Sequence, residues 1–236
     1  VCQMRTTPKL INSLIRLNCM VMLTGSKFYQ SPPFCGALLV PKTISSKLKN
    51  ISNKAIEPFL KIFSTSDISN THPELRNKFK KNENYGTLLR WEAAISEMKL
   101  LSFFGEDMVT SAIDRWNAFV ISQLQINSDF FELMPDQQFT NRSIISFNVK
   151  HKNGSLLSDD ELRVLYMKVC GEEREDFHDF KKIIIGQPVK YDNKSFIRLA
   201  LGSYNVRMLI ANDFDFSLDR KLINIIIQEV KELFWK

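Results

Sequence analysis

The run Thr24–Gly25–Ser26–Lys27 places a lysine behind two hydroxyl residues and a glycine, directly after a short apolar stretch. Hydroxyls and turn amides at such a place are donors for an anion, and a lysine amine beside them can attack a carbonyl carbon. A lysine that forms an imine with a phosphorylated aldehyde needs a dry pocket that favours its neutral form, with donors for the phosphate nearby. The commoner role of a lysine after a strand is a solvated surface side chain, so other parts of the chain must decide between the two.

Two further places in the sequence offer groups that could bind an anion. Gly86 and Thr87 begin the strongest helical pattern, where free amides, the helix dipole and a hydroxyl suit a phosphate. Arg198 interrupts the apolar run 195–201, and its guanidinium fits a bidentate clamp on a substrate carboxylate. The alternatives are plain N-capping by Thr87 and a structural salt bridge for Arg198.

Patterns in the first half predict the elements that position these residues. Helical spacing predicts helices over 7–16, 87–105 and 106–124, with a short one over 55–63 in an otherwise irregular stretch. Apolar runs at 19–23 and 36–40 predict short buried strands, which are typical of an α/β layer.

The second half alternates between strand and helix patterns. Strands are expected at 143–149, 182–185 and 195–201. Ser158 and Glu161 match a capping box that opens a helix, and Ser217 is expected to cap the terminal helix. We therefore expect an α/β protein with one unit over residues 1–126 and a small α+β unit over 127–236, joined by an irregular segment at 127–142.

Composition bounds the class of protein. The 236 residues are 44% hydrophobic and 25% charged, which is ordinary for a globular domain. The net charge is +6, but basic and acidic residues are interleaved, so we expect no nucleic-acid partner; the run 76–81 is the best local candidate. No apolar run approaches the roughly 18 residues that span a bilayer, so we expect no membrane partner.

Cysteine and histidine usage points away from disulfides and metals. Four cysteines lie at irregular spacing without a CxxC pair, which favours reduced thiols and a cytoplasmic location. Three histidines lie far apart with no metal-ligand spacing, so no metal site is predicted.

At these residues the chain resembles the class V aminotransferase family of fold-type I pyridoxal-phosphate enzymes. The family places its imine lysine after a strand in a run like Ser/Thr-x-His/Ser-Lys, followed by Pro and Gly before another strand. Here this run is Thr24-x-Ser26-Lys27, followed by Pro32-Pro33 and Gly36. The resemblance implies that Lys27 forms the internal aldimine with pyridoxal 5′-phosphate and that Thr24 and Ser26 help to hold the phosphate. Ser26 stands where many members carry histidine.

The resemblance extends to the other candidate residues. The family's Glu-x-Gly-Thr run looks like 83–87 with one extra residue, which implies that Gly86 and Thr87 reach the phosphate of a partner subunit in a homodimer. Arg198 looks like the late arginine that binds the carboxylate of an amino-acid substrate. Gln3 looks like the residue near the cofactor's phenolic oxygen, and the Asp expected three positions earlier would fall just before Val1. The match therefore covers the C-terminal part of such an enzyme, its large domain continued by a small domain, and we expect a fragment that is inactive alone.

The resemblance implies a pyridoxal-phosphate-dependent enzyme of the aminotransferase or lyase type. Desulfuration would need a nucleophilic cysteine near the site, and the late candidate Cys170 falls in an expected helix, where a small buried residue is commoner. The alternative is a non-catalytic, degenerate homologue that acts as an interaction protein. A third option, a nucleic-acid-binding domain, predicts steeply salt-dependent binding.

Overall fold

The computed structural model describes residues 8–47, 52–134, 142–171, 183–192 and 194–235. The chain divides into two compact units, Val1–Leu100 and Leu101–Lys236. The fold is mixed α/β, and all strand pairs of the described sheets are antiparallel. Within the described ranges, no helix combines the length and the apolar character needed to cross a membrane.

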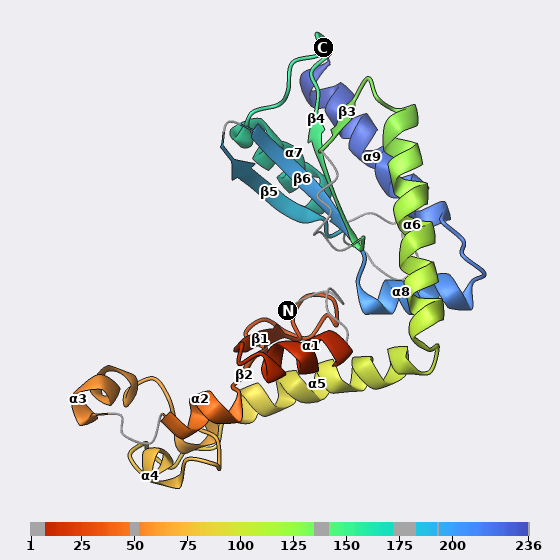
Figure 1. The fold of residues 1–236 in the computed structure, drawn as a ribbon. Helices are drawn as coiled ribbons and strands as arrows, with labels where there is room; N and C mark the ends of the chain where they lie inside the picture. The colour runs from red at the N-terminus through yellow and green to blue at the C-terminus, as the bar shows by residue number, and fades with distance from the viewer. Residues whose placement is uncertain (1–7, 48–51, 135–141, 172–182, 193, 236) are drawn as a thin grey trace. The chain divides into compact units, whose positions relative to one another are not determined.

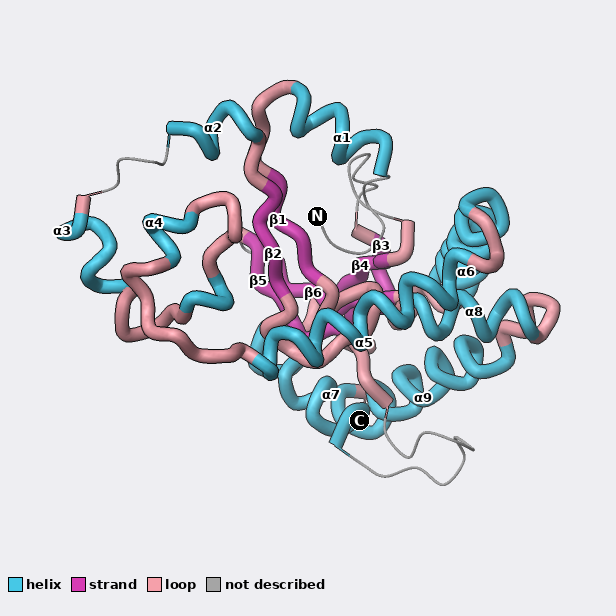
Figure 2. Tube along the Cα trace, turned by 90° about the horizontal axis from the view of Figure 1, so that it is seen from below, coloured by secondary structure: helices cyan, strands magenta, loops and turns pink. Residues whose placement is uncertain are grey.

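The first unit contains a two-stranded ribbon. Helix α1 (Pro8–Arg16) leads into β1 (Val21–Thr24), which pairs antiparallel with β2 (Gly36–Leu39), as Figure 2 shows. The predicted helix and both predicted strands are thus confirmed. The predicted burial is wrong for β2, whose residues are mostly exposed, and holds in β1 for Val21 alone. An apolar run alone does not distinguish a strand buried on both faces from one strand of an open ribbon.

Short helical turns fill the stretch between β2 and the long helices. They are α2 (Lys42–Lys47), α3 (Asn53–Ile56), the 3-10 helices η2 (Glu57–Phe59) and η3 (Thr65–Asp67), and α4 (Pro73–Arg76). The single helix predicted over 55–63 corresponds to α3 and η2, which together cover less of the chain.

Two long helices follow, α5 (Tyr85–Ser102) and α6 (Glu106–Ile126), and both were predicted. Between them Gly105 has φ +74°, a left-handed conformation that favours glycine. Helix α6 packs against strands and helices of the second unit. The compact units consequently divide before α6, whereas the predicted boundary lay at its end; helical periodicity does not reveal on which side of a linker a helix packs.

The second unit contains a four-stranded antiparallel sheet in the order β3-β4-β6-β5 (Figure 1). The strands are β3 (Phe131–Leu133), β4 (Ile144–Val149), β5 (Gly186–Tyr191) and β6 (Lys194–Ala200). Helix α7 (Asp159–Gly171) contacts β5 and β6, and α6 contacts β3 and β4, while α9 (Ser217–Phe234) packs on both helices. Alternate residues of β4 and β6 share one face of the sheet and are buried: Ile145, Phe147, Val149, Ile197 and Leu199.

Some details of the second unit differ from expectation. The strand predicted at 182–185 is wrong, because residues 183–185 belong to no sheet. The strand of this region is β5, which begins at Gly186. Gly186 and Pro188 disfavour a strand, but proline is tolerated at the edge position that β5 occupies. Strand β3 and helix α8 (Ser203–Ala211) were not predicted.

The helix caps give one confirmation and one correction. The capping box is confirmed: the Ser158 amide donates to Glu161, and the Glu161 amide donates to the Ser158 hydroxyl. Ser217 is not the cap of α9, because its own amide and hydroxyl donate to the carboxylate of Asp215.

A buried hydrogen bond joins α6 to α9. Trp116 Nε1 donates to Asp219 Oδ1 at 2.8 Å, and Trp116 is only 2% exposed. Burial raises the pKa of Asp219 above its ordinary value, although the bond from Trp116 acts in the opposite direction. This pair therefore links the packing of the two helices to pH.

Substitution of Asp219 tests that link. Asp219→Ala should lower the free energy of unfolding by about 1–3 kcal/mol, because the buried Trp116 N–H loses its acceptor. Since the pKa is higher in the folded state, wild-type stability should fall as pH rises from about 4, the unfolded value, through the folded value. Asp219→Asn keeps an acceptor but cannot ionise. Its free energy of unfolding, measured in urea, should therefore lack the pH dependence that Asp219 gives to the wild type. An identical pH profile for wild type and Asp219→Asn would contradict the assignment.

Candidate functional site

The loop that follows β1 holds the lysine and both hydroxyl residues. Thr24 Oγ1 and Ser26 Oγ lie 3.0 Å apart, and the Ser26 amide donates to Thr24 Oγ1 at 3.3 Å. The Gly25 amide donates to the Cys35 carbonyl at 2.9 Å, which closes the base of the loop. Lys27 itself is exposed, one residue beyond the hydroxyl pair. The structure thus brings two hydroxyls together on a short, tied turn, and Lys27 follows them with its side chain exposed.

Helix α5 holds this loop through three contacts. Gly25 lies so close to the helix that an added Cβ would be 2.6 Å from the Cβ of Ala94. The buried Ser31 hydroxyl donates to the Arg90 carbonyl at 2.6 Å, and Trp91 Nε1 donates to the Gly36 carbonyl at 3.3 Å. Helix α5 and the loop of Lys27 are therefore one packed body within the first unit.

The start of α5 is fixed by Asn84. Asn84 Oδ1 accepts from the Thr87 amide at 3.0 Å, and its Nδ2 donates to Asp67 Oδ1 at 2.8 Å. Burial alone would raise the pKa of Asp67, but hydrogen bonds from Ser64 and Asn84 lower it overall, so Asp67 is a charged acceptor. Asn84 rather than Thr87 is the N-cap, and among the described residues the Thr87 hydroxyl makes no hydrogen bond that would occupy it.

Arg90 is a candidate that sequence reasoning missed. A Cβ on Gly86 would lie 2.7 Å from Nη1 of Arg90, so the guanidinium reaches back over the first turn of α5. Arg90 Nε is buried and lacks a hydrogen-bond partner within the described part of the chain. The signal available in the sequence was the spacing: a long side chain on a helix covers the residue four positions before it.

Arg198 lies on β6 in the second unit. Its guanidinium forms no ion pair with a described carboxylate, and its Nη2 donates to the Gln187 carbonyl at a long 3.5 Å. Gly186 on β5 faces it, and an added Cβ there would lie 2.9 Å from the Arg198 Cβ and 3.4 Å from Nε. The structural salt bridge considered as an alternative is thus absent from the described residues. The Arg198 side chain lies over β5, where Gly186 has no side chain to obstruct it.

The other predicted residues are placed as follows. Thr24, Ser26, Lys27, Gly86 and Thr87 belong to the first unit, and Arg198 belongs to the second. Gln3 lies outside the described residues.

Two other kinds of candidate group are the Cys170 thiol and possible metal ligands. Cys170 is half-buried in α7, and burial raises the pKa of its thiol, which disfavours the reactive thiolate. No group of three or more His, Cys, Asp and Glu side chains in these ranges is arranged to hold a metal ion.

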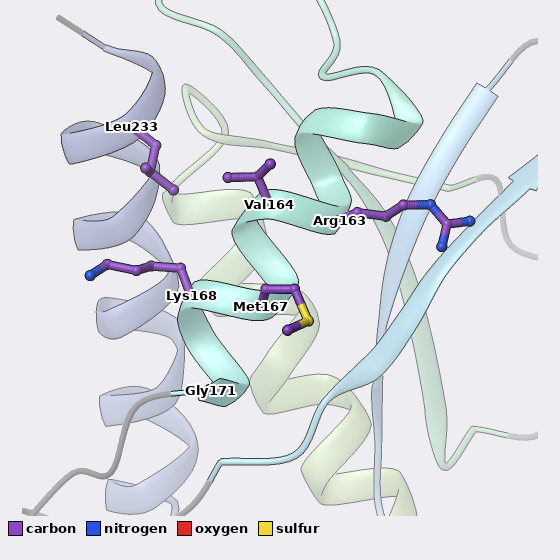
Figure 3. Close-up of a pocket in the computed structure, with 6 residues that line it drawn as sticks. All are labelled: Arg163, Val164, Met167, Lys168, Gly171 and Leu233. Atoms are coloured by element: carbon purple, nitrogen blue, oxygen red, sulfur yellow. The ribbon is translucent and has the colours of Figure 1, made fainter.

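Two surface pockets include none of the candidate residues. One is formed by α7 and α9 and is lined by Arg163, Val164, Met167, Lys168, Gly171 and Leu233 (Figure 3). The other lies around α3 and Lys78. Neither includes Lys27, so neither supplies the dry surroundings that an imine lysine needs.

The close approach at Gly25 leads to a test of the loop. Gly25→Ala should lower the free energy of unfolding by about 1–3 kcal/mol, because the new methyl group overlaps Ala94 and the Cys35 sulfur. Gly36→Ala is the matched control, since its nearest neighbour is a backbone oxygen at 3.8 Å. Urea unfolding followed by circular dichroism compares the two variants. Equal stability of both would contradict the packing of the loop on α5.

Comparison with known proteins adds no family to this geometry. No family model matches the chain, and no curated protein matches it. Functional inference therefore rests on the residues and their arrangement.

Proposed function

We propose that the chain is part of a pyridoxal-phosphate-dependent enzyme of the class V aminotransferase type, an aminotransferase or lyase that acts on an amino acid. In this proposal the first unit is the C-terminal part of a fold-type I large domain and the second is the small domain. The observation that carries it is the loop of Lys27, with its paired hydroxyls, packed directly on α5, whose first turn contains Gly86 and Thr87.

The residues present fit the phosphate end of the cofactor. Thr24 and Ser26 supply hydroxyls beside Lys27, while Thr87 and Arg90 supply a hydroxyl and a guanidinium at the start of α5. Helix N-termini and arginine forks are the groups that bind phosphate in proteins. Following the resemblance, Gly86 and Thr87 would serve the phosphate of the second subunit of a homodimer.

The remaining roles fall to Lys27 and Arg198. The cofactor, when bound, supplies an electron sink for the chemistry at the substrate's α carbon. Lys27 would hold the cofactor through its amine and move a proton at that carbon when free. Arg198, which has no carboxylate partner among the described residues, would bind and orient the substrate carboxylate.

Exposure of Lys27 favours a second candidate function. Imine formation requires a neutral amine, which removal from water favours. A non-catalytic homologue that acts as an interaction protein needs no dry pocket, and the exposed Lys27 agrees with it. The enzyme proposal requires that a surface outside the loop and α5 cover the lysine.

The proposal also concerns partners and location. In this proposal the protein is a homodimer that acts on a small-molecule amino-acid substrate in the cytoplasm. The proposal includes no membrane partner and no nucleic-acid partner.

Chemical trapping tests the role of Lys27. The full-length protein to which, in this proposal, the chain belongs is incubated with pyridoxal 5′-phosphate and reduced with borohydride, and peptides are examined by mass spectrometry. We expect the adduct to concentrate on Lys27 and the visible absorbance band to disappear in Lys27→Ala. Lys42→Ala, which removes another exposed lysine of the first unit, should keep the band. Adducts spread evenly over Lys27 and Lys42 would refute the enzyme proposal and leave the interaction protein.

A further inference from the structure

Helix α5 presents an apolar face that nothing in the described chain covers. On the side that meets the loop of Lys27 it uses Arg90, Trp91 and Ala94. The opposite side carries large apolar side chains that are well exposed: Tyr85 at 62%, Leu88 at 60%, Leu89 at 67% and Ile95 at 39%. At 3.6 residues per turn these four positions fall on one half of the helix surface. An exposed stripe of this kind is typical of a binding surface.

The charges on this face are self-complementary. It carries Glu92 and Lys99, which have opposite signs and lie two turns apart along the helix. If a second copy of α5 packs antiparallel, with the two-fold axis between Ile95 and Ser96, Glu92 of each copy faces Lys99 of the other. The pair then occurs twice, as the symmetry of an isologous interface requires.

We propose that this surface, the α5 face (Tyr85, Leu88, Leu89, Glu92, Ile95 and Lys99), packs antiparallel on the same face of a second copy of the chain. This inference rests on the proposed function, which includes a homodimer. It adds the surface through which the two copies meet. Ile95 lies next to the two-fold axis, Leu88 and Leu89 lie about two turns from it on either side, and the two charge pairs between them fix the antiparallel register.

The overall charge of the first unit does not exclude self-association. Residues 1–100 contain fifteen Lys and Arg against six Asp and Glu, so two such units repel each other at long range. Salt screens this repulsion beyond about 8 Å at 0.15 M. The α5 face itself carries one charge of each sign, which fits a second copy better than an acidic partner, because Glu92 would repel the latter.

Sedimentation equilibrium of the full chain at about 0.15 M salt tests the register. Wild type should dimerise. Glu92→Lys or Lys99→Glu should each raise Kd by about tenfold or more, because each places like charges across the interface twice. The double variant Glu92→Lys/Lys99→Glu should return Kd to within a few-fold of wild type, because the pairing is restored with reversed signs.

Two further variants separate the interface from general effects. Lys42→Glu changes the net charge as Lys99→Glu does but lies on α2, so Kd should stay close to that of wild type. Leu89→Ser removes an exposed apolar side chain of the face and should also weaken the dimer. Circular dichroism of each variant confirms that it is folded.

A monomeric wild type would overturn the inference. So would a dimer that the α5 variants leave unchanged, or a double variant that fails to restore the dimer. The proposed function stands or fails separately. A dimer disrupted as described but with no preferential trapping at Lys27 would retain the α5 face and refute the enzyme. Trapping at Lys27 in a monomer would do the opposite.

Discussion

The close approach of α5 to Gly25 is the constraint on which the candidate site depends. With no side chain at this position, the helix and the loop meet at a distance that even an alanine would violate. That contact, with the bond from Ser31 to the Arg90 carbonyl, fixes how Thr24, Ser26 and Lys27 are presented. It also determines which side of α5 is used internally, and the uncovered side follows from it. Close packing thus sets both the geometry of the loop and the position of the exposed face.

Two glycines place two arginines by the same physical means. Gly86 leaves space for the guanidinium of Arg90 at the start of α5, and Gly186 leaves space for Arg198 on the sheet. In both cases the arginine has a buried Nε without a partner in the described chain, which costs free energy unless something else binds it. A carboxylate or phosphate could accept a hydrogen bond from such an unmet Nε. The two arginines therefore support anion binding more directly than the sequence pattern that drew attention to only one of them.

Periodicity predicted the elements whose stability depends on local pattern. Helices α5, α6 and α7 and strands β4 and β6 follow from spacing and capping, as the Ser158 box shows. Three features depended on tertiary context instead: the edge strand β5 with its proline, the exposure of β2 and the side on which α6 packs. For the site, the sequence showed the order of Thr24, Ser26 and Lys27. It did not predict that Asn84 caps α5 or that the Arg90 side chain extends back over Gly86. These require knowing where α5 begins, and helix boundaries are the least certain part of any pattern.

The two candidate functions make opposite demands on the surroundings of Lys27. Imine chemistry needs the amine removed from water, and the loop on its own leaves it solvated. Rigid attachment of the loop to α5 means that desolvation cannot come from the loop folding inward, since Gly25 already touches Ala94. The covering surface must therefore come from outside this packed body. A second copy seated on the opposite side of α5 does not by itself cover the lysine, so dimer formation and activation of Lys27 are separate requirements that a functional enzyme has to meet together.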